Sequence, residues 1–246
     1  MELPLPLSAR QRIDDFRERL QQIPTNLNEY RYDPFGLDLS FFEEFAPLFV
    51  LGYDLYHHVE VSGVENVPEG PVLLVGNHAG NTLPTDAGAV VTAMILEAEP
   101  PRIPRGMAES YLPTIPFFNQ LVYRGGAIVG TPENCTRLLR AGECILVFPE
   151  GSHGISKAYQ LQHFGLGFAR LALETGAPAF PVTWGFPWLG FVPMPVKYRL
   201  HFGKPIQRQG DANDEDDVQQ EQVRIVKDEI SHLIQLGLHE RKDWFR

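Results

Sequence analysis

Two short apolar runs, each followed at once by a loop of glycine, proline and polar residues, constrain most strongly what this chain can fold into. Val72–Val75 runs into the loop Gly76–Gly80, and Cys144–Phe148 runs into Pro149–Gly151. Short, continuously apolar runs are typical of strands buried on both faces of a parallel sheet. Such sheets place their sites in loops at the carboxyl ends of the strands. The two loops are therefore the first candidates for a functional site.

Segments with helical spacing alternate with strand-like segments along the chain. We expect helices over residues 8–22, 40–58, 86–97, 131–141 and 163–175, and a long helix in the tail, where apolar residues recur between Val223 and Ile234. Further strands are expected in the segments 59–62, 178–184 and 197–203. This alternation predicts an α/β fold with a mixed, largely parallel sheet flanked by helices, an N-terminal helical segment and a long C-terminal helix.

Length and charge restrict the function classes. The chain has 246 residues, of which 43% are hydrophobic, enough for one sizeable core. We expect an N-terminal helical segment over 1–58 and the α/β domain over 59–246. A net charge of -10 argues against a nucleic-acid binder, and no polybasic cluster is present for docking on anionic lipid. Any membrane contact should therefore be mainly apolar.

Cysteine use and the start of the chain bear on location. Cys135 and Cys144 form no metal-type pair, and we expect two free thiols in a reducing compartment. The start lacks the basic and apolar regions of a signal peptide, and no apolar run reaches the length of a membrane-spanning helix. We expect a cytoplasmic protein, peripheral on the inner face of a membrane.

The first candidate motif is the loop that begins with Asn77-His78 and ends at Asp86. Histidine suits proton abstraction from an alcohol because its ordinary pKa lies near neutral pH. An aspartate that accepts the other ring N–H fixes the tautomer and stabilises the imidazolium. The simpler alternatives are that His78 bonds a backbone carbonyl and that Asp86 only caps the following helix.

The second candidate motif is Phe148-Pro149-Glu150-Gly151-Ser152, again at the end of an apolar run. Pro149 cannot continue a central strand, and Gly151 permits a tight turn with close approach of a ligand. A lone acid in such a place is often only a helix cap or a surface charge. Its position some seventy residues after the Asn-His loop makes the motif more informative.

Together these motifs resemble those of the glycerol-phosphate and lysophospholipid acyltransferase superfamily. Four blocks match in order: Asn77-His78 with Asp86, Gly126–Val129, Phe148–Ser152 and Ala177–Val182. The third block is the most specific, and the second and fourth are weak when taken singly. The ordered set covers residues 72–183.

The resemblance implies a mechanism. His78 would deprotonate the acceptor hydroxyl, which then attacks the thioester of acyl-CoA or acyl-carrier protein, and Asp86 would orient His78. The turn Phe148–Ser152 would hold the lipid acceptor, with Glu150 bonding its hydroxyl or shaping the pocket. Backbone N–H groups near Gly151 could stabilise the oxyanion. The mechanism implies no metal and no cofactor beyond the thioester co-substrate.

This chain departs from the family in two places. Seven residues separate His78 from Asp86, where many members have four, so the loop must bulge for the two side chains to meet. The arginines with which phosphate-acceptor members bind phosphate are missing from the second block and after Gly151. Substitutes would be Arg105, Arg124 and Lys157, each expected as a surface or rim charge. We therefore expect a glycerol-phosphate acceptor less than a neutral lipid, glycolipid or other lysolipid hydroxyl.

Two aromatic stretches bear on the membrane. One consists of Phe41, Phe42, Phe45 and Phe49, and the other runs from Trp184 to Pro195 and is too broken for a regular element. Either stretch could form an apolar docking face or line an acyl groove. The alternative is that the first stretch packs into the core and the second is a surface loop. Two rival functions also stay open: a thioesterase that uses His78 on water, and a catalytically silent lipid-binding protein on the same fold.

Overall fold

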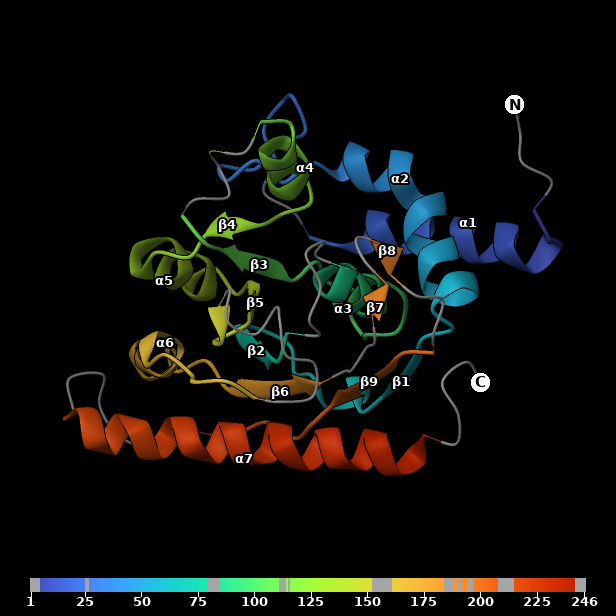
Figure 1. The fold of residues 1–246 in the computed structure, drawn as a ribbon. Coiled ribbons are helices and arrows are strands. Elements are labelled where there is room, and N and C mark those ends of the chain that lie inside the picture. The colour runs from blue at the N-terminus through green and yellow to red at the C-terminus, as the bar shows by residue number, and fades with distance from the viewer. Residues whose placement is uncertain are drawn as a thin grey trace.

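The computed structural model describes residues 5–24, 27–78, 85–110, 114, 116–151, 161–183, 188–189, 192–193, 197–207 and 215–241 (Figure 1). Its helices are α1 (Leu7–Gln22), α2 (Leu39–Leu51), α3 (Thr85–Leu96), α4 (Phe118–Arg124), α5 (Pro132–Arg140), α6 (Gly167–Thr175) and α7 (Asp216–Glu240). A π-helical turn, η1 (Gly52–Tyr56), extends α2, and a 3₁₀ turn, η2 (Val64–Asn66), follows the first strand.

Seven strands form one sheet in the order β1-β9-β6-β2-β5-β3-β4. They are β1 (Glu60–Ser62), β2 (Val72–Gly76), β3 (Arg105–Ala108), β4 (Ile128–Val129), β5 (Cys144–Val147), β6 (Ala179–Thr183) and β9 (Arg199–Phe202). Neighbouring strands are parallel except for β6 and β9, which are antiparallel. The predicted mixed, largely parallel sheet with a long C-terminal helix is thus confirmed.

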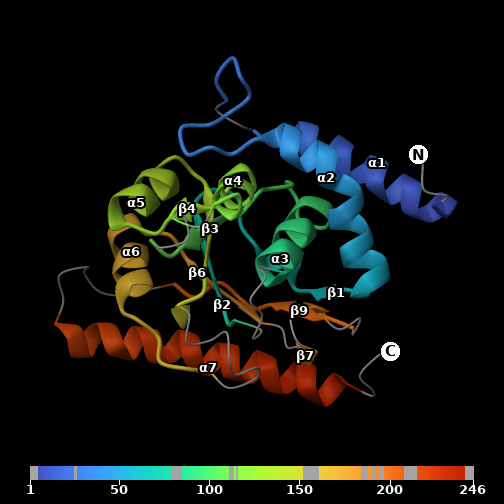
Figure 2. The ribbon, with the colours of Figure 1, turned by 45° about the horizontal axis from the view of Figure 1, so that its top comes forward.

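Each central strand serves two cores because its side chains alternate between the faces of the sheet. Val72 and Leu74 of β2 belong to a core shared with α1, α2 and α3. Leu73 and Val75 belong to a second core shared with α5, α6 and α7. Figure 2 shows these two groups of helices on opposite sides of the sheet. Burial on both faces explains why β2 reads as one continuous apolar run.

The N-terminal helices pack into the first core. Phe41 and Phe42 of α2 are almost fully buried, and Phe45 and Phe49 pack against the same cluster. The rings of Phe42 and Phe49 stack with centroids 5.3 Å apart. For this stretch the structure therefore shows the core alternative, not a docking face. The boundary expected at residue 58 stays a prediction.

Sequence reasoning missed regular structure in two places. None of the strands expected from the sequence lies within residues 102–130, but this segment contains β3 and β4 besides α4. The segment 184–195 was expected to hold no regular element, yet β7 (Trp188–Leu189) and β8 (Val192–Pro193) form a short antiparallel hairpin. Strands of two to four residues carry too little pattern to be recognised. The rest of that segment lies outside the described residues.

Two kinds of feature are absent from the described residues. No helix there has both the length and the apolar character needed to cross a bilayer. Nor do any three His, Cys, Asp or Glu side chains in that part of the chain gather as a metal site would require.

Candidate active site

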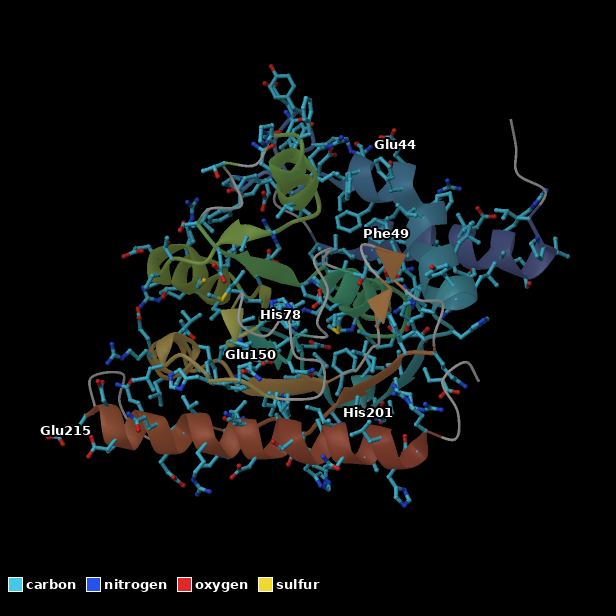
Figure 3. All side chains as sticks on the ribbon, viewed as in Figure 1. Glu44, Phe49, His78, Glu150, His201 and Glu215 are labelled. Carbon is cyan, nitrogen blue, oxygen red and sulfur yellow. The ribbon has the colours of Figure 1, made fainter. Side chains whose placement is uncertain are left out.

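The sheet brings the two candidate motifs to one edge. β2 and β5 are parallel neighbours, with Val75 paired in register to Val147, so their carboxyl ends lie side by side. His78 follows β2, and Glu150 follows β5. Figure 3 shows the two side chains close together at this edge. The carboxyl edge of the sheet is therefore the candidate site, as expected for an open α/β sheet.

Asp86 reaches His78 across the longer loop. His78 Nδ1 and Asp86 Oδ2 are 2.8 Å apart. Asp86 is only 1% exposed and lies in the first turn of α3, where the helix dipole favours a negative charge. Its other oxygen, Oδ1, accepts the Ala87 N–H at 2.8 Å. The loop between the two residues, 79–84, lies outside the described residues. The hydrogen bond is of the kind that orients a general base.

The bond to Asp86 determines which nitrogen of His78 can act as a base. A carboxylate accepts, so in the neutral ring Nδ1 carries the proton and Nε2 keeps its lone pair. Among the described residues nothing forms a hydrogen bond with Nε2, and the side chain is 19% exposed. The ring stacks on Phe148 with centroids 4.3 Å apart. This stacking and the Asp86 bond hold the imidazole in one orientation with Nε2 available to a substrate.

The surroundings of His78 raise its pKa. Burial, the largest single influence, would lower that pKa by disfavouring the charged ring. The hydrogen bond and charge of Asp86, with the charges of Glu150 and Glu109, together outweigh burial. His78 is therefore a stronger base than an isolated histidine, and its protonated form is stabilised.

Glu150 ties two loops together. Its carboxylate is buried and accepts the backbone N–H of His78 at 3.2 Å and that of Gln162 at 2.9 Å. Burial raises the pKa of Glu150, against the opposing effect of these two N–H groups and of the His78 and Lys227 charges. Of the two roles expected for Glu150, these contacts match shaping the pocket. These contacts place the Glu150 carboxylate against the backbone N–H of His78.

Gly151 is required by the turn itself. It has a φ of +55°, and its N–H donates to the Phe148 carbonyl at 3.1 Å. A Cβ at this position would lie 2.9 Å from Glu109 Oε1. Pro149 helps close the turn, since its carbonyl accepts the Gly165 N–H at 3.3 Å. Ser152 lies outside the described residues.

Glu109 is the site residue that sequence reasoning missed. It follows β3 directly, so the parallel sheet carries it to the same edge as the motifs after β2 and β5. Its side chain is exposed, unlike those of Asp86 and Glu150. The only signal in the sequence was an acid after a strand, and that strand was not recognised.

The arginines considered as phosphate ligands lie elsewhere. Arg105 was expected at the surface or rim, but it is fully buried, with its Nε bonded to the Gly126 carbonyl at 2.6 Å and its Nη1 to Asp33 Oδ2 at 2.5 Å. It lines a cavity of about 350 Å³ near the amino ends of β3 and β5. Arg124 pairs with Asp38 at the start of α2, at 2.9 Å. Lys157 lies outside the described residues.

A cavity of about 710 Å³ lies beside the turn, between α5 and α6. Its apolar lining residues include Val147, Pro149, Met107 and Phe168. Arg170 and Gln219 are polar residues of its lining. The cavity thus offers a partly apolar volume next to the candidate motif.

Both cysteines are free and buried. Burial raises the pKa of Cys135 to about 11 and that of Cys144 to about 12. At neutral pH both are thiols, not thiolates, which agrees with the expectation of two free core thiols.

Comparisons with known proteins identify the class to which this fold and site belong. Residues 58–185 match the sequence profile of the Acyltransferase family, and the chain belongs to that family. The predicted resemblance to this superfamily is confirmed. A further match supports the fold: the crystal structure of the 1-acyl-sn-glycerophosphate acyltransferase PlsC from Thermotoga maritima superposes with a TM-score of 0.51 at 17% identity, over 94% of this chain and 84% of that one.

Two relatives show how far the sequence similarity extends along this chain and along theirs. An uncharacterized protein of Mycobacterium tuberculosis is 34% identical over 217 residues, which cover 72% of this chain and 60% of that protein. A mouse protein named "DGAT1/2-independent enzyme synthesizing storage lipids" is 27% identical over 180 residues, which cover 62% of this chain and 54% of that protein. The chain thus spans little more than half the length of the curated relatives it matches.

Proposed function

We propose that this protein transfers a fatty acyl group from the thioester of acyl-CoA or acyl-carrier protein to a hydroxyl of a lipid, with His78 as the general base. The observation that carries the proposal is the 2.8 Å hydrogen bond between His78 Nδ1 and Asp86 Oδ2, at the edge where the Phe148–Gly151 turn also lies. The names of the mouse relative and of the PlsC structure, which concern storage lipids and acylated glycerophosphate, support a lipid acceptor.

The proposed reaction has two stages. The acceptor hydroxyl donates its proton to His78 Nε2 while its oxygen attacks the thioester carbonyl carbon, giving a tetrahedral oxyanion. That intermediate collapses, the carbon–sulfur bond breaks, and the proton held by His78 passes to the departing thiolate. The products are an ester and a free thiol, and His78 is neutral again.

Asp86 and Glu150 have different supporting roles in this proposal. The Asp86 carboxylate stabilises the imidazolium formed in the first stage, because it already bonds the Nδ1 proton. Glu150 holds the His78 backbone and the chain at Gln162, so the base stays beside the turn. The apolar part of the cavity, lined by Val147, Pro149, Met107 and Phe168, suits a fatty acyl chain.

The spacing between His78 and Asp86 was the reason to consider a catalytically silent protein. Because the hydrogen bond between His78 and Asp86 forms despite that spacing, the spacing is no longer a reason to favour a catalytically silent protein. The thioesterase alternative differs only in the nucleophile, which would be water.

Substitution of the base tests the proposal. We expect His78→Ala to lower acyl transfer from radiolabelled oleoyl-CoA to lipid in vesicles by about 10²–10⁴-fold, the usual contribution of a general base. His232→Ala, at an exposed position on α7, is the matched control and should retain activity. Thioester hydrolysis without added acceptor would support the thioesterase. Vesicle binding without turnover in the wild-type protein would support the silent lipid binder.

A further inference from the structure

We propose that Glu109 makes this site select an uncharged lipid alcohol, such as a monoacylglycerol, over an alcohol that carries a phosphate next to the reacting hydroxyl. The inference rests on the proposed function, and it adds to it the substrate class and a specificity-determining residue. No motif in the sequence pointed to Glu109.

The backbone places the Glu109 carboxylate at the site. Glu109 follows β3, which is the neighbour of β5, and Glu150 and Gly151 follow β5. Glu109 Oε1 lies 2.9 Å from the point where a Cβ of residue 151 would be. The carboxylate therefore faces the turn in which the acceptor is proposed to bind, and its exposure leaves it accessible to a substrate.

Among the described residues, the strongest charge effects on the base come from negative groups. Asp86, Glu150 and Glu109 each stabilise the protonated form of His78. Lys227 acts on Glu150, and its Nζ donates to the Gln162 carbonyl at 2.7 Å. A phosphate beside a hydroxyl bound at His78 Nε2 would therefore approach carboxylates, at a partly buried place where like charges repel strongly.

Of the three basic residues considered as phosphate ligands, two are engaged elsewhere, and the third, Lys157, lies outside the described residues. Phosphate is best bound by the planar fork of arginine. Arg105 is bonded to Asp33 and the Gly126 carbonyl, and Arg124 is paired with Asp38. Glu109 thus stands at the site where a phosphate-acceptor enzyme needs a cation.

Two short-chain acceptors that differ only by a phosphate group test the inference. 1-Octanoylglycerol and its 3-phosphate should be compared at equal concentrations at which both are monomeric. For the wild-type protein we expect kcat/KM to favour the uncharged alcohol on the order of tenfold, and added salt to reduce this ratio.

Charge substitutions at Glu109 sharpen the test. Glu109→Gln should reduce the ratio severalfold, mainly through a lower KM for the phosphate, and Glu109→Lys should reduce it further. Glu65→Gln makes the same change in net charge at an exposed position in η2 and should leave the ratio unchanged.

The outcomes separate this inference from the proposed function. If both alcohols are acylated but the phosphate is preferred, or Glu109→Gln leaves the ratio unchanged, the inference is wrong while the acyltransferase proposal stands. If neither is acylated, the proposed function fails for these acceptors. Dissociation constants of the same two lipids, measured without acyl donor, then decide the selectivity: tighter binding of the phosphate overturns it.

Discussion

The two edges of the central sheet use charge in opposite ways. At the amino edge, the guanidinium of Arg102 donates to the carbonyls of Pro68, Gly70 and Gly142, and Arg105 is held by Asp33. At the carboxyl edge, three carboxylates surround one imidazole. At the amino edge, the partners of each arginine hold chain segments together. The excess of negative charge at the second edge is unfavourable for folding alone, and it is the arrangement expected of a site that tunes a base.

The largest expected effect concerns the carboxyl edge. Asp86→Asn should lower kcat by about 10³–10⁴-fold, because the amide can neither accept the Nδ1 proton in the same way nor stabilise the imidazolium. Exposed Asp15→Asn on α1 is the matched control. Unchanged turnover in Asp86→Asn would mean that Asp86 only caps α3.

The same variant has a pH signature. Activity of the wild-type protein should rise with pH as His78 loses its proton, with an apparent pKa above the usual 6.5 because the carboxylates stabilise the charged ring. Asp86→Asn removes the main stabilising partner, so this rise should move to lower pH. A pH profile of kcat/KM for both proteins measures the shift.

At the amino edge, we expect a substitution to lower the free energy of unfolding and to leave kcat unchanged. Arg105→Leu leaves the Asp33 carboxylate without its cation and the Gly126 carbonyl without a donor, which should cost about 3–5 kcal/mol in the free energy of unfolding. Urea unfolding measures it. The folded fraction should keep the wild-type kcat, and a lower kcat there would contradict the division between the two edges.

Gly151→Ala should have a smaller effect on stability. The positive φ of residue 151 should cost about 1 kcal/mol in the free energy of unfolding, and the contact with Glu109 should displace that side chain as well. Gly142→Ala is the matched control, because Gly142 has a φ of +83° with open space around its Cβ position. If Gly151→Ala and Gly142→Ala lower activity equally, the contact with Glu109 does not contribute to activity.

The smallest expected effect is the pH dependence of stability. The raised pKa of His78 means that the folded protein binds a proton more tightly than the unfolded chain. This stabilisation is fully present below the unfolded pKa of about 6.5 and is lost as the pH rises through the folded value. The difference in unfolding free energy between wild type and His78→Gln should therefore shrink from pH 6 upward. A constant difference would rule out a raised pKa.

Local patterns in the sequence predicted part of this site well. His78 and the residues Phe148–Gly151 were found because each follows a strand buried on both faces, which reads as an apolar run. The contact to Asp86 could only be expected conditionally, because spacing alone does not fix the path of a seven-residue loop. The start of α3 at Thr85 places Asp86 in its first turn.

Non-local contacts account for what the sequence did not predict. Arg105 was taken for a surface charge because its partner, Asp33, lies 72 residues away. The same burial hid β3, since the sequence RGMA has a charged first residue and no apolar run. Without that strand, nothing placed Glu109 at the carboxyl edge.

The proposed proton-transfer pair and Glu109 lie on separate parts of the scaffold. His78 and Asp86 flank the β2–α3 connection, whereas Glu109 is carried by β3, with β5 between the two strands. We therefore expect mutations after β3 to change which alcohol is accepted while the proposed proton-transfer pair stays intact. A lineage built on this scaffold could move between charged and neutral lipids in single steps, without passing through an inactive ancestor.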